Sequence, residues 1–281
     1  MSKIEQVKDD DDQINQLKAV SWKGISMSED IKPTELVQSL VKGLVVIQAF
    51  NQQRPAMTLS EVASVTGYTR AATRRFLLTL VNEGFAKQEG KLFSLTAKVL
   101  NLGFAYLSTV DVWHNAKPIM EQLVEQLNES CSAAVLDGND VVYVARVATT
   151  KRIMSITLNV GTRLPAISTS MGRMLLASLS DSALDEYLNQ CELVKHTQYT
   201  LVEKDALKAD ILQVRAQGYS MVEQEFELGL TSISVPVHNG AGEVIAALNV
   251  STHMSQTARQ QILEVILPEL KQSVKRIEQL G

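Results

Sequence analysis

Apolar residues recur at helical spacing at the start of the region that begins at Pro33, and they predict a helix with two apolar faces. One face comprises Leu36, Leu40, Leu44 and Ile47, and the face beside it comprises Val37, Val41 and Val45. One of these faces can pack in a local core. The other needs a partner, which is either a second copy of the chain or a broader buried face within the monomer.

Two further helices are expected, separated by a tight turn. Thr58 and Glu61 have the spacing of a capping box, in which the hydroxyl and the carboxylate bind free N–H groups of the first helical turn. Gly67 can adopt a positive φ in the following turn, and Thr69 can cap a third helix that runs to about Glu83. Three short helices with a glycine turn between the second and the third are typical of a helix-turn-helix.

The exposed side of the third helix is basic. Thr73, Phe76 and Leu80 share its apolar side, whereas arginines gather at its exposed first turns. An arginine at the N-terminus of a recognition helix can contact guanine or phosphate in the major groove. Taken alone, a solvated basic face explains these residues equally well. The candidate DNA contacts on this helix are Thr69, Arg70, Ala71, Arg74 and Arg75.

A hairpin is expected directly after this helix. Residues 85–95 have strand-like composition on both sides of a Glu89-Gly90 turn, and Lys87 and Lys91 can lie along a sugar-phosphate backbone. Helices, turn, arginines and wing therefore occur in the order of a winged helix-turn-helix. This order favours DNA binding over a winged helix that binds another protein.

The remainder of the chain predicts a linker helix and an antiparallel sheet with separate helices, which is an α+β domain. Expected strands are 132–136, 141–147, 153–158, 232–237 and 244–251, and expected helices are 112–128, 172–179, 181–189, 204–217 and a last helix from about residue 256. The predicted organisation is a poorly ordered acidic tail at 1–32, a DNA-binding domain at 33–95, a linker helix at 96–111 and a sheet domain at 112–281.

Charge is distributed unevenly along the chain, whose formal net charge is -4. The net charge is -2 for residues 1–32, +4 for residues 33–108 and -6 for residues 109–281. A basic module joined to an acidic one is consistent with a first domain that meets phosphate. The sequence has no apolar run of roughly 18 residues, so we expect a cytoplasmic protein without a membrane partner.

Cysteines and histidines do not form a site pattern. The two cysteines, Cys131 and Cys191, and the four histidines are scattered without metal-ligand spacing. We therefore expect neither a metal nor a cofactor.

A polar loop at 161–172 is a candidate ligand site. Arg163 can pair with a carboxylate, and Ser168, Thr169 and Ser170 offer hydroxyl groups near the start of a helix. In the alternative interpretation, Arg163 is a surface ion-pair residue and the serines are helix caps.

The winged N-terminus and the stretch GTRLPAISTSMGRMLLA resemble the IclR family of bacterial regulators over residues 36–280. The stretch resembles in particular the subgroup that controls aromatic-acid catabolism through β-ketoadipate and 4-hydroxybenzoate. The resemblance implies a GAF-like effector domain and a dimer or dimer of dimers joined largely through the DNA-binding domains. It adds Ser232, Asn249 and Ser251 to the candidate pocket residues. An acidic position that some members use near the pocket falls on Val222, so a ligand inferred from those members, such as a small keto acid, is not transferred to this chain.

The function expected is therefore that of a transcription regulator, not an enzyme. Its expected partners are double-stranded operator DNA, a small aromatic carboxylate such as 4-hydroxybenzoate or protocatechuate, and RNA polymerase as a further candidate. One alternative is a winged-helix adaptor that binds protein. Another is a hydrolase with Ser170 as nucleophile and a histidine as base, although the GxSxG motif is absent.

Overall fold

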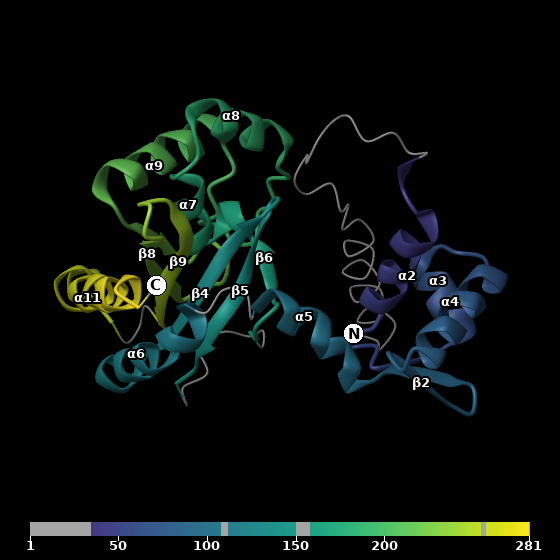
Figure 1. Cartoon of the computed structure of the whole chain (residues 1–281). Coiled ribbons are helices and arrows are strands. Elements are labelled where there is room, and N and C mark those ends of the chain that lie inside the picture. Colours follow the sequence, from purple (N-terminus) through teal and green to yellow (C-terminus); the bar gives the residue numbers. More distant parts are fainter. Residues whose placement is uncertain (1–34, 108–111, 150–157, 254–256, 281) are drawn as a thin grey trace, which may run out of the picture. The chain divides into compact units, whose positions relative to one another are not determined.

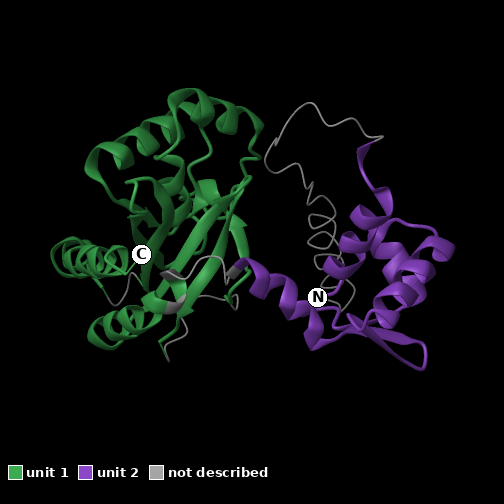
Figure 2. Ribbon diagram, viewed as in Figure 1, with its two compact units in different colours: residues 1–26, 112–281 green, residues 27–111 purple. Residues whose placement is uncertain are grey.

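The computed structural model describes residues 35–107, 112–149, 158–253 and 257–280. They belong to two compact units, one within residues 27–111 and the other within 112–281 (Figure 2). The expected tail at 1–32 lies outside the described residues, as do residues 153–157 of one expected strand.

The first unit combines short helices with a three-stranded antiparallel sheet of order β1-β3-β2. Its core is formed by residues such as Val46, Val62, Leu77 and Phe93. Its elements are α2 (Gln38–Gln48), β1 (Ala56–Thr58), α3 (Leu59–Thr66), α4 (Arg70–Asn82), β2 (Ala86–Glu89), β3 (Leu92–Leu95), η3 (Ala97–Val99) and α5 (Leu100–Leu107).

Local sequence signals place the two central helices. The hydroxyl of Thr58 accepts a hydrogen bond from the Glu61 N–H at 3.4 Å, and the Glu61 carboxylate accepts one from the Thr58 N–H at 2.6 Å, so the expected capping box is confirmed. Gly67 ends α3 with φ of 71°, and the Thr69 side chain caps α4.

The expected wing is present as the β2–β3 hairpin, in which Gln88 pairs with Phe93 and Gly90 takes a φ of 62°. Strand β1 was not expected, because its three residues are too few to show alternation. It joins the wing through pairing of Met57 with Phe93, which buries both side chains.

The second unit is built on a six-stranded antiparallel sheet of order β6-β5-β4-β9-β8-β7. Its strands are β4 (Ser130–Asp137), β5 (Asp140–Val147), β6 (Arg163–Pro165), β7 (Ser220–Glu223), β8 (Leu230–His238) and β9 (Val244–His253). Its helices are α6 (Val112–Leu127), η4 (Ala166–Ser168), α7 (Ser170–Leu176), α8 (Asp181–Gln190), α9 (Lys204–Gln217), α10 (Arg259–Gln261), η5 (Ile262–Ile266) and α11 (Leu267–Glu278).

Helices cover both faces of this sheet (Figure 1). Helix α7 lies against β4, β8 and β9 on one face, and α6 and α11 pack on the other. The apolar core beneath α7 to α9 includes Met171, Leu184, Leu207 and Ile211. Because helices pack on each face, side chains that point to either side of the sheet are buried, which explains the near-continuous burial along β8.

Several elements of the second unit differ from the sequence prediction. Strands β6 and β7, of three and four residues, were missed because they are too short for a periodic signal. Helix α7 spans Ser170–Leu176 rather than 172–179, since Thr169 caps it. The last helix includes a π-helical stretch at Ile262–Ile266. None of the described helices has both the length and the apolarity that a membrane span requires.

Candidate nucleic-acid interface and ligand pocket

The N-terminal turns of α4 present the predicted DNA contacts to solvent. Thr69, Arg70, Ala71, Arg74 and Arg75 are all exposed, while Leu77 of the same helix is buried. The guanidinium groups of the three arginines make no hydrogen bond or ion pair with any residue that the structure describes. The helix end is thus a basic surface that can contact phosphate or base edges.

The wing adds two exposed lysines to this unit. Lys91 is at the hairpin turn, and Lys87 forms a surface ion pair with Glu89 at 2.7 Å. An exposed ion pair of this kind is worth about 0 to 1 kcal/mol, so Lys87 can exchange Glu89 for a phosphate at little cost.

The first unit also exposes apolar side chains on α2 and α5. Leu40 of α2 is 63% exposed, and Phe104 of α5 is 69% exposed. A groove of about 800 Å³ between α2 and α4 is lined in part by Leu40, Leu44, Arg75 and Leu102. Arg75 therefore lies farther round the helix than Arg74, towards α2.

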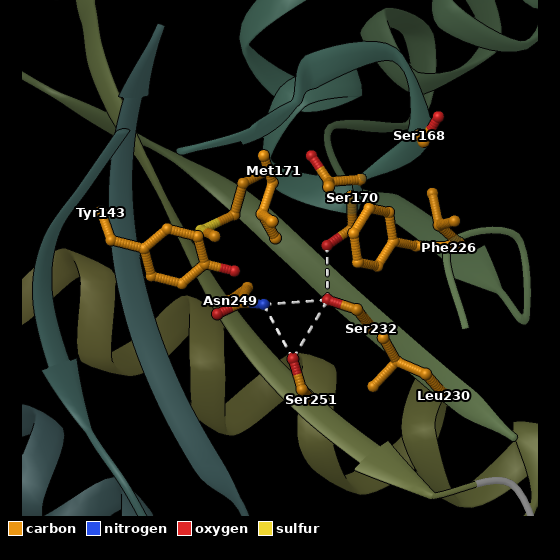
Figure 3. Close-up of a pocket in the computed structure, with 12 residues that line it drawn as sticks. Tyr143, Ser168, Ser170, Met171, Phe226, Leu230, Ser232, Asn249 and Ser251 are labelled. Atoms are coloured by element: carbon orange, nitrogen blue, oxygen red, sulfur yellow. Dashed lines mark hydrogen bonds between the residues drawn. The ribbon is translucent and has the colours of Figure 1, made fainter. Parts of the chain in front are cut away.

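In the second unit, a cavity of about 30 Å³ lies between the sheet and the start of α7 (Figure 3). No histidine, carboxylate, lysine or arginine is among the described residues that line it. Its walls are formed by Tyr143, Leu164, Ser168, Thr169, Ser170, Met171, Val222, Phe226, Leu230, Ser232, Asn249 and Ser251.

A hydrogen-bonded polar patch forms the floor of the cavity. Asn249 Nδ2 donates to Ser232 Oγ at 2.9 Å and to Ser251 Oγ at 3.0 Å, and a 2.6 Å hydrogen bond joins Ser232 Oγ to Ser170 Oγ. Asn249 Oδ1 is buried and has no partner among the described residues. Since an unpartnered buried carbonyl is costly, this oxygen is an unsatisfied acceptor beneath the floor of the cavity.

Strand pairing brings these residues together. Ser232 on β8 is directly opposite Ser251 on β9, and Asn249 is two residues before Ser251, so all three side chains leave the same face of the sheet. Tyr143 on β5 completes this face, and in Figure 3 its phenol oxygen points into the pocket. Burial raises the pKa of Tyr143 to about 12, so the phenol is a neutral hydrogen-bond donor at physiological pH.

Residues at the start of α7 have different roles. Thr169, and not a serine, caps α7 by accepting a hydrogen bond from the Gly172 N–H at 3.1 Å, and it also lines the cavity. Ser170 joins the polar patch. Gly172 permits close packing, because a Cβ at this position would lie 1.9 Å from the Ala166 carbonyl oxygen.

Arg163 is not placed as a ligand residue. Its guanidinium group donates to Asp137 Oδ2 at 2.6 Å and to Asp140 Oδ2 at 3.0 Å, and it does not line the cavity. The alternative interpretation of Arg163 as an ion-pair residue is the one that fits this geometry. The two carboxylates occupy the N–H donors of the guanidinium fork.

Arg173 was not predicted from the sequence as a residue of this region. Its side chain is 2% exposed and binds Glu225 through two hydrogen bonds, of 2.7 and 2.6 Å. A signal existed in the sequence, because an arginine on an otherwise apolar helix such as MGRMLLA needs a buried partner.

Comparison with known proteins identifies both units. The IclR helix-turn-helix domain matches residues 39–90, and the IclR C-terminal domain matches residues 104–279. The chain belongs to the IclR family of bacterial transcriptional regulators. As an IclR-family member it is a DNA-binding regulator and not an enzyme.

Individual IclR-family proteins resemble the chain over most of its length. The Pca regulon regulatory protein of Pseudomonas putida is 45% identical over 84% of this chain and 81% of its own. The p-hydroxybenzoate hydroxylase transcriptional activator of Acinetobacter baylyi is 32% identical over 90% and 95%. A crystal structure of an IclR homologue from Microbacterium hydrocarbonoxydans complexed with 4-hydroxybenzoate matches with a TM-score of 0.76 and 25% identity, covering 86% of this chain and 98% of that one.

Proposed function

We propose that this IclR-family regulator binds operator DNA through α4 and the wing, and that a small hydroxylated aromatic carboxylate bound in the second unit changes its affinity for that DNA. The observation that carries the proposal is the neutral pocket, which has aromatic and apolar walls above a floor of hydroxyl and amide groups. Aromatic acids are named in relatives and bound in a homologous structure, which supports the same ligand class here.

The polar groups of the pocket suit such a ligand. A ring packs between apolar walls such as Tyr143 and Phe226, and its carboxylate accepts hydrogen bonds from the serine hydroxyls and the phenol. Asn249 Oδ1 can accept a hydrogen bond from a ring hydroxyl. Since no cation lines the described pocket, hydroxyl and amide donors carry the recognition of the carboxylate.

The size of the cavity links binding to a change of shape. A cavity of about 150 Å³ admits benzene, whereas the space here is about 30 Å³. An aromatic acid therefore requires that side chains such as Met171 and Phe226 move outward. A ligand that selects such a widened form can shift the equilibrium between two arrangements of the protein.

Calorimetry tests the ligand assignment. 4-Hydroxybenzoate and protocatechuate should bind the unaltered protein more tightly than a non-aromatic keto acid does. Asn249→Ala should weaken 4-hydroxybenzoate by about 1 to 3 kcal/mol, since it removes the acceptor and unpairs the patch. Asn239→Ala, in the β8–β9 turn, is the matched control and should bind normally. Absence of heat with every aromatic acid contradicts the assignment.

Substitution of the basic surface tests DNA binding. Arg74→Ala should weaken operator binding by about 1 to 3 kcal/mol at fixed salt and leave effector binding unchanged. Arg276→Ala, on α11, removes an arginine from the other unit and serves as the control. Equal operator affinity of Arg74→Ala and the unaltered protein would remove this contact from the proposal.

The apolar faces of α2 and α5 support a homodimer, or a dimer of dimers, formed through the DNA-binding units. Sedimentation analysis should show dissociation for Leu40→Glu and Phe104→Glu, and an unchanged mass for both variants contradicts this interface.

Such a dimer would bind a pseudo-palindromic operator in the cytoplasm. RNA polymerase is a further proposed partner, and a supershift of the operator complex on addition of the polymerase would reveal it.

A further inference from the structure

Arg173 connects three separate segments around the pocket. From its place in α7, the guanidinium group donates to the Ile167 carbonyl oxygen at 2.9 Å and to Asp210 Oδ2 of α9 at 3.1 Å. It also makes the bidentate pair with Glu225, at 2.7 and 2.6 Å. These donors lie in a fixed fork, so the group holds its partners in one relative arrangement.

Glu225 lies in the loop 224–229 between β7 and β8, beside Phe226, which lines the pocket (Figure 3). Its Oε2 also accepts a hydrogen bond from the Leu201 N–H at 2.8 Å, and its carbonyl oxygen accepts one from Thr200 Oγ1 at 2.7 Å. Arg173 on one side and the segment that contains Thr200 and Leu201 on the other therefore hold Glu225, which fixes the backbone immediately before Phe226.

Arg173 and Glu225 each hold a segment that forms a different wall of the pocket. The Arg173 end holds the Ile167 carbonyl, next to Ser168, which lines one wall. The Glu225 end holds Phe226, which lines another. Arg173 is 2% exposed, and such a buried pair is hard to break on one side because the remaining charge is left without a partner.

We propose that Arg173 and Glu225 are positioning residues that set the spacing between these two walls, and thereby the preference of the pocket for a planar ring acid. Neither side chain lines the described cavity, so both act through Ser168 and Phe226. This inference rests on the proposed function, because it concerns the selectivity of the same pocket.

Conservative variants separate positioning from general stabilisation. Arg173→Lys keeps the charge but loses the fork, and Glu225→Gln places an amide N–H₂ where an oxygen now accepts from Arg173 or Leu201. Arg215→Lys is the matched control. Arg215 also bridges segments, through the Ala177 and Leu179 carbonyls and Asp181, but neither these partners nor the residues next to them line the cavity.

Affinities for 4-hydroxybenzoate and for an acyclic keto acid are measured for each variant by calorimetry. Arg173→Lys and Glu225→Gln should lower the ratio of the two affinities at least ten-fold, and Arg215→Lys should leave it within two-fold. A purely structural role would weaken both ligands together and leave the ratio unchanged, which would overturn the inference. If neither pair variant folds, Phe226→Leu should lower the ratio, and an unchanged ratio overturns the inference in that case.

Hydrogen exchange distinguishes failure of this inference from failure of the proposed function. If the unaltered protein binds no aromatic acid, the proposed function fails. Glu225→Gln should still accelerate amide exchange in segments 197–201 and 224–229 relative to the unaltered protein, with β4 unaffected. Equal exchange in these two segments would overturn the positioning role of the pair.

Discussion

Replacement of Gly172 by alanine tests how the pocket loop is held. The Cβ of alanine would lie 1.9 Å from the Ala166 carbonyl oxygen and 2.3 Å from the Ala166 Cα. Real Cβ atoms essentially never approach a non-bonded heavy atom closer than 3.0 Å, so η4 or α7 must move away by more than 1 Å. The obstructing atoms are backbone, so rotation of a side chain cannot relieve the overlap.

The net cost follows from three contributions. Overpacking costs about 1 to 3 kcal/mol, and retreat of η4 strains hydrogen bonds such as Arg173 Nε to the Ile167 carbonyl, each worth about 0.5 to 1.5 kcal/mol. Alanine favours the helix over glycine by about 1 kcal/mol, which offsets part of the cost. We expect the free energy of unfolding of the second unit to fall by about 0.5 to 3.5 kcal/mol.

Chemical denaturation followed by Trp113 fluorescence measures this change, because Trp113 is buried in α6 of the same unit. A Trp22→Phe background removes the other tryptophan. Gly240→Ala is the matched control, since a Cβ there has nothing within 4 Å, and its midpoint should not move. A Gly172→Ala protein as stable as the control would refute the close-packing argument.

Three further predictions concern titratable groups. Hydrogen bonds from the Thr58 backbone and side chain lower the pKa of Glu61 below its ordinary value of 4.5. The capping box therefore stabilises the fold fully above pH 4.5, and this contribution is lost as the pH falls through the lower pKa of the folded state. Thr58→Ala should reduce the acid dependence of the free energy of unfolding, and a pH profile identical to that of the unaltered protein contradicts this. Burial raises the pKa of Cys131 and of Cys191, so a disulfide reagent should label both thiols slowly until denaturant is added, and rapid native labelling of Cys131 would count against its burial. Since the pKa of Tyr143 is raised to about 12 and no acid or histidine is among the described lining residues, 4-hydroxybenzoate affinity should be constant from about pH 6.5 to 8, and a titration in that range would implicate another group.

The sequence predicted the first unit closely because its signals are local. The Thr58 capping box, the Gly67 turn and the Thr69 cap each act within a few residues, and the structure confirms all three. The wing was equally visible, since Gly90 marks a turn between two strand-like stretches. Strand β1 was not predicted, because its three residues are too few to show alternation and its partner β3 is distant in sequence.

The pocket was less predictable because it depends on long-range pairing. Ser232 and Asn249 entered through resemblance to the IclR family, and only the β8–β9 register shows that they meet. Arg163 was a reasonable candidate by residue type, but Asp137 and Asp140 bind it in the structure. The Arg173–Glu225 pair spans 52 residues, a separation over which spacing in the sequence carries no information about contact.

The affinity of the protein for DNA upstream of its own coding region, measured by fluorescence anisotropy at one salt concentration, tests the coupling of ligand to operator most directly. Saturating 4-hydroxybenzoate should change the dissociation constant by about 5- to 150-fold, because coupled sites typically share 1 to 3 kcal/mol. An unchanged constant, in a sample that calorimetry shows to be occupied by the acid, would contradict a ligand-responsive regulator.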